Sequence, residues 1–135
     1  MTIARHKHDA VLLSDGTVLI VGGSDARDDL GLYDSAEIFD PTTDSFSPAG
    51  RLAEARYKMR GTTVLLGDGR ALVCCGAGEP EAFDPASDTF QVIPGSLGAG
   101  PLFAAAALLG KREVLVTGGY SLEGPATADA WIVRA

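Results

Sequence analysis

The chain has 135 residues, a length typical of one domain, and 46% of them are hydrophobic and 21% charged. This composition is that of a globular protein and excludes a disordered or fibrous chain. The net charge of −7 argues against a nucleic-acid partner. No apolar run approaches the ~20 residues of a membrane helix, and no signal peptide is visible, so no membrane partner and, by default, a cytoplasmic location are expected.

The first 50 residues predict four short strands. An apolar run at 9–13, the pair Asp15-Gly16 and the run VLIVGG at 18–23 predict a tight hairpin, because Asp-Gly tolerates the positive φ of such turns. The segment AEIFD at 36–40 predicts a third strand. Asp40-Pro41 then starts a turn, since Asp caps its first position and Pro presets φ at the next, and a fourth strand follows with Phe46.

Two further copies of this unit follow along the chain. The second has first and second strands near 62–66 and 70–74 and the segment PEAFDPASDTF at 80–90. The third has strands near 104–109 and 113–117 and the segment ADAWIV at 128–133. Trp131 follows Phe83 by 48 residues, which aligns it with Phe83 and Phe39. Repeat register therefore favours strands over the helix propensity of 103–109, and one helical turn is left open within 51–60.

The segment RHKHDAVLLSDGTVLIVGG, from Arg5 to Gly23, resembles the kelch repeat in its bacterial form, as does the following AEIFDPTTDSF. Kelch repeats form four-stranded blades of a β-propeller. The resemblance implies an all-β partial propeller of three antiparallel blades over about residues 4–50, 51–95 and 96–135, the last lacking its fourth strand. In the second repeat Cys75 replaces the first glycine, and Gly61 or Arg60 falls at the position of His8; the third repeat lacks the Arg and the His.

Three blades do not close a ring, because propellers have four to eight. An open arc exposes an apolar sheet face at each end and the strand edge at 131–133. We therefore expect either further blades or self-association, and a dimer related by a two-fold axis would supply six blades.

The recognition surface is expected on one face of the propeller. In an antiparallel meander alternate loops emerge together, and the longer, more variable ones are residues 24–35, 77–79, 120–127, 47–60 and 91–101. The candidate binding residues on or beside this face are Arg5, His8, Asp25, Tyr33, Arg56, Arg60, Glu79 and Tyr120.

Several of these candidates have a structural alternative. Arg5, Arg56 and Arg60 suit a carboxylate ligand, but Arg5 would also suit a role in pinning the blade connection to backbone carbonyls. His6 and His8 alternate as i, i+2 on one side of a strand. Two imidazoles lack a third metal ligand, which favours a bond from His8 to loop backbone and predicts no metal site.

The other polar and aromatic candidates are equally open. Asp25, Asp28 and Asp29 lack the regular alternating spacing of a calcium-binding loop, so we expect them to be solvated carboxylates. Cys74 and Cys75 lie within a predicted buried strand and are expected to pack as small hydrophobic residues. Tyr33, Tyr57 and Tyr120 would either stack on a sugar or peptide or pack within their loops.

The function that best fits this repetition is a non-catalytic binding or scaffold module for a protein or glycan, with no catalytic residue and no cofactor predicted. The alternative is a sugar-active kelch enzyme. A sialic-acid mutarotase-like site would use an arginine with Glu79, and a fragment of a galactose-oxidase-like propeller would need histidine, tyrosine and cysteine together. A truncated gene product without a role of its own is the third possibility.

Overall fold

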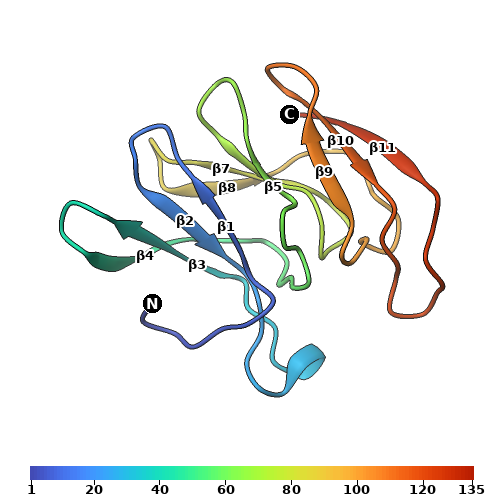
Figure 1. Cartoon of the computed structure of the whole chain (residues 1–135), viewed down its shortest axis with the longest axis horizontal. Helices are drawn as coiled ribbons and strands as arrows, with labels where there is room; N and C mark the ends of the chain where they lie inside the picture. The colour runs from blue at the N-terminus through green and yellow to red at the C-terminus, as the bar shows by residue number, and fades with distance from the viewer.

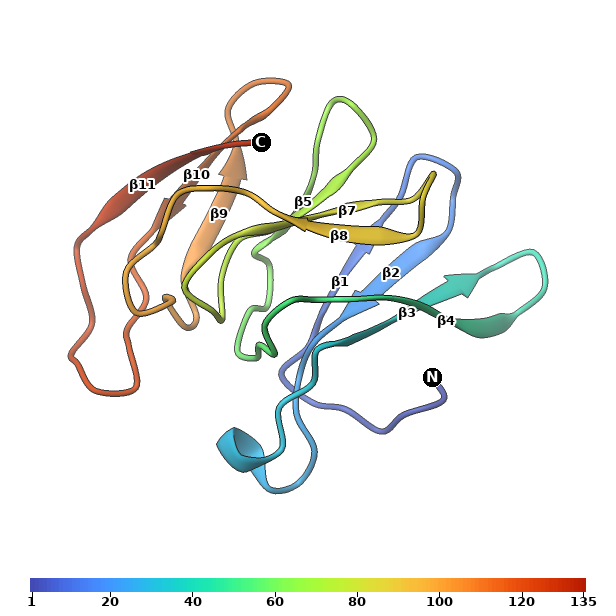
Figure 2. The same ribbon diagram turned by 180° about the vertical axis from the view of Figure 1, so that it is seen from behind.

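The computed structural model describes residues 1–135 and arranges them in three antiparallel sheets that follow the chain order (Figures 1 and 2). The first sheet contains β1 (Asp9–Leu12), β2 (Val18–Val21), β3 (Ser35–Asp40) and β4 (Ser45–Arg51). The second contains β5 (Thr63–Leu65), β6 (Ala71–Val73), β7 (Glu81–Asp84) and β8 (Thr89–Val92). The third contains β9 (Ala105–Leu108), β10 (Glu113–Thr117) and β11 (Ala130–Arg134). The all-β fold of partial propeller blades is confirmed.

Local chemistry sets the turns as the sequence predicts. Gly16 and Gly69 have φ values of +88° and +91°, and each ends an Asp-Gly turn between the first two strands of a sheet. The Asp15 carboxylate accepts a hydrogen bond from the Thr17 backbone N–H at 2.9 Å. Asp40 accepts one from the Thr42 N–H at 2.8 Å, so the Asp-Pro turn is capped as expected.

Three details differ from the sequence predictions. Strand β4 extends to Arg51, into the segment expected to be loop. The helical turn left open within 51–60 is absent, and the one helix is the short 3-10 turn η1 (Asp28–Leu30), which was not predicted. The structure has no helix that could span a membrane. In the third sheet Val133, not Trp131, takes the position of Phe39 and Phe83, because Val133 pairs with Val114 as Phe39 pairs with Val18.

The core lies between neighbouring sheets. The first strands are adjacent, since β1 contacts β5 and β5 contacts β9. Leu19 and Val21 pack against Val73 and Phe83 between the first two sheets. Leu72, Cys74, Cys75, Val114 and Val116 pack between the second and third. The middle sheet is thus buried on both faces, which explains its continuous apolar run.

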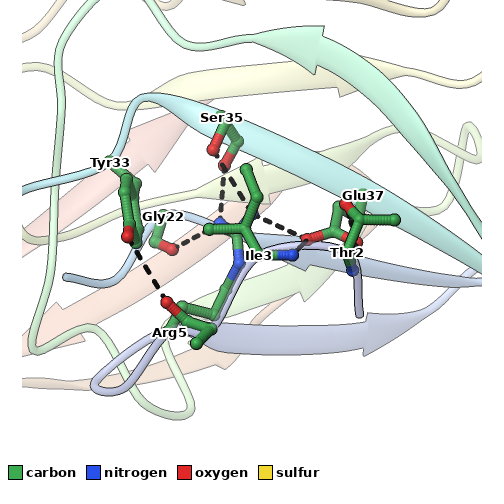
Figure 3. Close-up of polar contacts among 8 residues, drawn as sticks. Thr2, Ile3, Arg5, Gly22, Tyr33, Ser35 and Glu37 are labelled. Carbon is green, nitrogen blue, oxygen red and sulfur yellow. Dashed lines mark hydrogen bonds and ion pairs between the residues drawn. The ribbon is translucent and has the colours of Figure 1, made fainter. Parts of the chain in front are cut away.

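A buried ion pair connects each of the first two sheets to the segment that leads into it. In the first, the Arg5 guanidinium donates to the carbonyls of Gly22 at 2.7 Å and Ser35 at 3.0 Å, and to Glu37 Oε1 at 3.0 Å (Figure 3). Glu37 in turn accepts hydrogen bonds from the backbone N–H groups of Thr2 at 2.7 Å and Ile3 at 3.4 Å. Glutamate and arginine together therefore fix the path of residues 2–5.

The second sheet repeats this arrangement residue for residue. Arg56 donates to the carbonyls of Cys75 and Glu79 and to the Glu81 carboxylate. Glu81 accepts from the N–H groups of Ala53 at 2.8 Å and Glu54 at 3.3 Å. In each pair the arginine side chain is 0% and the glutamate 2% exposed. We call the pairs Arg5–Glu37 and Arg56–Glu81 the arginine–glutamate clamps.

Replacing one partner of a clamp should destabilise the fold far more than replacing an exposed arginine. Arg56→Ala leaves the Glu81 carboxylate buried without its counter-charge, and we expect a loss of roughly 3–5 kcal/mol in unfolding free energy. Arg60→Ala is the matched control, since Arg60 is exposed and makes no ion pair, and it should change stability by less than about 0.5 kcal/mol. Urea unfolding followed by circular dichroism at one protein concentration measures both. Equal stability of the two variants would contradict a structural role for the clamp.

The first clamp should also give the fold an acid-sensitive contribution to stability. Although burial raises the pKa of Glu37, hydrogen bonds from Thr2 and Arg5 outweigh it and hold this pKa below 4.5. The ionised carboxylate therefore stabilises the fold fully above about pH 4.5, and this contribution is lost as the pH falls through the folded pKa. Glu37→Gln should be less stable than wild type by roughly 1–3 kcal/mol at neutral pH.

This stability difference should shrink as the pH falls below 4.5. Unfolding curves from pH 7 to the acid range test it, with Glu123→Gln as the control because Glu123 lies exposed in a loop. A difference that stays constant across this range would show that the ionisation of Glu37 does not contribute.

Candidate functional site

The long loops gather on one side of the molecule and the tight turns between first and second strands on the other. In Figure 1 the segments after β2 and β10 reach toward the bottom, and the turns after β1, β5 and β9 point to the top. We define the loop face as the β2–β3, β6–β7 and β10–β11 loops together with the connections 52–62 and 93–104. This is the face on which recognition was predicted.

A cavity of about 450 Å³ opens on the loop face and is bounded by loops of all three sheets. Each of the five bounding segments contributes to the wall, with Leu32, Tyr57, Ala77, Leu102 and Leu122 as one example from each. We call it the loop cavity. Its wall also carries Glu54 and Glu123, so an apolar surface is combined with two carboxylates. Such a mixture of apolar wall and few polar groups is typical of a binding site.

A group of basic residues lies in a separate cavity of about 490 Å³ beside β1 and β9. Lys7, His8, Lys58, Arg60 and Phe103 line it. The Lys58 ammonium lies 4.8 Å from the centroid of the Tyr57 ring, a cation–π distance. Burial, and next the nearby Arg5 charge, lower the pKa of His8 below 6.5, which favours its neutral form at pH 7. The structure thus brings two predicted residues, His8 and Arg60, into one cavity.

Arg5, Tyr33 and Asp25 lie together at the first sheet but serve mainly to hold the chain. The Arg5 guanidinium carbon is 5.3 Å from the centroid of the Tyr33 ring, and the Tyr33 hydroxyl donates to the Ala4 carbonyl at 3.3 Å. Asp25 forms an ion pair with Arg27 at 2.6 Å, and this hydrogen-bonded partner lowers the pKa of the Asp25 carboxyl. The role of Arg5 in pinning the connection is the one that the structure supports.

The arginines expected to grip an external carboxylate are not all available for it. Arg5 and Arg56 are buried in the clamps and already bind Glu37 and Glu81. Only Arg60 of the three is exposed without an ion pair. Glu79 is exposed, and its carbonyl, not its carboxylate, contacts Arg56 at 3.2 Å. A site that combines Arg56 with Glu79 as a catalytic pair is therefore not assembled.

The two histidines do not share one side of a strand, contrary to the i, i+2 prediction. Lys7 between them has a φ of +55°, which breaks the strand alternation. His6 Nε2 contacts the Asp25 carbonyl at 2.7 Å, whereas His8 Nδ1 is buried without a hydrogen-bond partner. The imidazole of His6 thus bonds to loop backbone. No three His, Cys, Asp or Glu side chains are grouped so as to hold a metal ion.

Both cysteines are free and buried, as expected for packing residues. Burial raises the pKa of the Cys74 thiol far above its usual range, and it raises that of Cys75 to about 11. Both thiols are therefore protonated at neutral pH and poor nucleophiles.

Tyr120 lies at a second cavity of the loop face, of about 350 Å³, together with Pro101, Asp129 and Trp131. Its ring centroid is 6.1 Å from that of Phe103 and 5.6 Å from the Lys58 ammonium. Sequence reasoning missed Lys58, Pro101 and Trp131 as site residues. Aligning Trp131 with the aromatic residues of the other repeats hid its different position in the sheet.

Comparison with known proteins agrees with this architecture. The model of the Kelch motif matches residues 10–52. A solved structure titled "Structure of YjhT" matches with a TM-score of 0.79 at 14% sequence identity, covering 96% of this chain and 48% of that one. The chain thus spans about half the length of this neighbour, and the likeness at such low identity concerns the fold. No curated protein matches significantly.

The motif match falls on the first sheet, and the structural match extends over nearly the whole chain. Residues 10–52 carry the Kelch motif, and the three sheets have the fold of consecutive blades of a β-propeller.

Proposed function

We propose that this kelch module binds a protein or glycan through the loop face. The observation that carries the proposal is the loop cavity, because loops of all three blades contribute to its wall. Apolar side chains such as Leu32 and Leu122 offer a contact surface, and Glu54 and Glu123 offer hydrogen-bond acceptors. A ligand bound there would contact each blade, which suits a propeller whose variable loops carry recognition.

Binding is favoured over sugar chemistry by the way in which the arginines are used. The mutarotase-like alternative needs an arginine for the substrate carboxylate and an acid or base beside it. Arg5 and Arg56 are occupied by internal glutamates, and the remaining Arg60 lies in the basic cavity rather than in the loop cavity. Both cysteines are buried with raised pKa values, which disfavours the oxidase-like alternative too.

The loop cavity should lose its ligand when its apolar wall becomes charged. A panel of defined oligosaccharides and short peptides is titrated by calorimetry against wild type, Leu122→Asp and Leu109→Asp. Leu122 lines the cavity and is 63% exposed, whereas Leu109 is 54% exposed at the turn after β9 on the opposite side. We expect at least one panel member to bind wild type and Leu109→Asp, and Leu122→Asp to bind it about tenfold more weakly, a change of about 1.4 kcal/mol. The absence of any binder, or equal binding by all three proteins, would contradict the proposal.

We further propose that two copies assemble head to tail into one ring. Two sets of backbone hydrogen bonds connect successive blades. Gly23 N–H donates to the Arg56 carbonyl at 2.8 Å, and one blade later Gly76 N–H donates to the Pro101 carbonyl at 3.2 Å. In the opposite direction, Lys58 N–H donates to the Lys7 carbonyl at 2.9 Å and Phe103 N–H to the Lys58 carbonyl at 2.8 Å.

The outermost groups of both sets lack backbone partners and are complementary. Gly119 N–H and the Phe103 carbonyl have no backbone partner in the third blade, and neither do the Arg5 carbonyl and Lys7 N–H in the first. The third blade of one copy would thus match the first blade of another.

Self-association should depend on the free apolar face of the third blade. Ile132 is 48% exposed on this face, opposite Leu115, whereas Leu30 is 80% exposed on η1 of the loop face. At micromolar concentration we expect wild type and Leu30→Arg to scatter light with twice the 13.9 kDa mass of one chain. Ile132→Arg should have the mass of one chain, since a charge would be buried unpaired. A folded wild-type monomer, or open polymers, would contradict the two-copy ring.

A further inference from the structure

The third blade lacks the arginine that fills the other two, although its backbone follows the same path. Gly76 N–H donates to the carbonyl of Pro101 as Gly23 N–H donates to that of Arg56. Leu102 exchanges two backbone hydrogen bonds with Tyr120, as His6 does with Ser24. These pairings place Pro101 at the position of Arg5 and Arg56.

The glutamate of the clamp is also replaced, and strand register identifies its replacement. Glu37 pairs with Ile20, Glu81 with Val73 and Trp131 with Val116 at equivalent positions of the three sheets. Trp131 therefore stands where the other blades have glutamate. Neither charge of the clamp is present in the third blade.

The carbonyl acceptors of the clamp are kept. Gly22 N–H donates to the Ser35 carbonyl at 3.1 Å, and Gly118 N–H donates to the Asp129 carbonyl at 2.9 Å. Gly118 and Asp129 thus correspond to Gly22 and Ser35, whose carbonyls both accept from the Arg5 guanidinium. The Ser35 carbonyl accepts from Gly22 and Arg5 together, so the Asp129 carbonyl also has room for a second donor.

Pro101, Asp129 and Trp131, which correspond to Arg5, Ser35 and Glu37, line one cavity of about 350 Å³ together with Tyr120. We call it the third-blade cavity. The Asp129 carboxylate at its wall is exposed and forms no ion pair. In each of the first two blades, the corresponding position holds an arginine guanidinium group.

We propose that the third-blade cavity binds the guanidinium group of an arginine side chain supplied by a protein partner. The carbonyl of Asp129, which borders the cavity, would accept its N–H groups as the Ser35 carbonyl accepts those of Arg5. The indole of Trp131 offers a cation–π surface in place of the glutamate, and tryptophan is the best aromatic residue for this. The Asp129 carboxylate and the net charge of −7 favour a cationic ligand.

This inference rests on the proposed binding function and specifies one partner chemistry for the loop face, an arginine-bearing peptide. It adds a site beside the loop cavity, since Ala99 and Ser121 border both. An arginine held in the third-blade cavity would extend a peptide toward Leu122.

The single tryptophan of the chain makes binding directly observable. Trp131 fluorescence is followed while N-acetyl-arginine amide is added, and the experiment is repeated with N-acetyl-citrulline amide, which has nearly the same shape without the charge. We expect a saturable change with the arginine compound and an at least tenfold weaker response to citrulline. No saturable change, or equal affinity for both compounds, would overturn the inference.

Variants distinguish this cavity from unspecific attraction of a cation. Pro101→Arg places the protein's own guanidinium in the cavity and should abolish the response, and Asp129→Asn should weaken binding three- to tenfold. Asp44→Asn, in the distant β3–β4 turn, is the matched control and should bind as wild type does. Undiminished binding by Asp129→Asn overturns the proposal even if Pro101→Arg fails to fold. If arginine binding fails while a panel ligand still depends on Leu122, only this inference falls and the proposed function stands.

Discussion

The buried arginine–glutamate clamps determine how the chain enters a blade. The segments before β1 and β5 have no strand partners for their first backbone N–H groups, and the carboxylates of Glu37 and Glu81 accept hydrogen bonds from these groups. A carboxylate in such a place needs a counter-charge, which Arg5 and Arg56 supply while also donating to backbone carbonyls. Because the carboxylates and the terminal guanidinium N–H groups of the clamps bind groups of the same chain, they hold each blade connection, and with it the loop face, in position.

The glycines that follow the second strands of the first two blades lie in close contact with the same connecting segments. A Cβ atom on Gly23 would lie 2.6 Å from the His6 carbonyl oxygen, and one on Gly76 would lie 2.7 Å from that of Tyr57. Both glycines also have positive φ values, of +91° and +83°. A side chain at either position would clash with the clamp segment, and the positive φ also favours glycine. Both requirements together select glycine here.

The third blade differs from the first two at the clamp positions, where we propose a binding site. The backbone pairing that connects Gly76 to Pro101 is kept in the third blade, while proline and tryptophan replace arginine and glutamate. Replacing a buried ion pair with apolar groups is compatible with a stable fold. In this blade it also leaves carbonyl acceptors and an open cavity on the loop face, where the other two blades are filled. The two end blades also have backbone N–H and carbonyl groups without backbone partners, and the proposed assembly relies on these groups.

The strand order, the turn positions and the propeller class follow from the sequence, because each depends on neighbouring residues. Asp-Gly and Asp-Pro pairs act within four residues, and the apolar runs between them repeat. Contacts between residues far apart in the sequence are visible only in the tertiary structure. Arg5 and Glu37 are 32 residues apart, so only folding shows that this arginine binds a glutamate of its own chain rather than a ligand. The backbone pairing of β10 with β11, and not the aromatic side chain, sets the position of Trp131, and the left-handed Lys7 separates two histidines that strand alternation would place together. Sequence thus determined the elements, and long-range hydrogen bonding and charge pairing determined which side chains remain free for a partner.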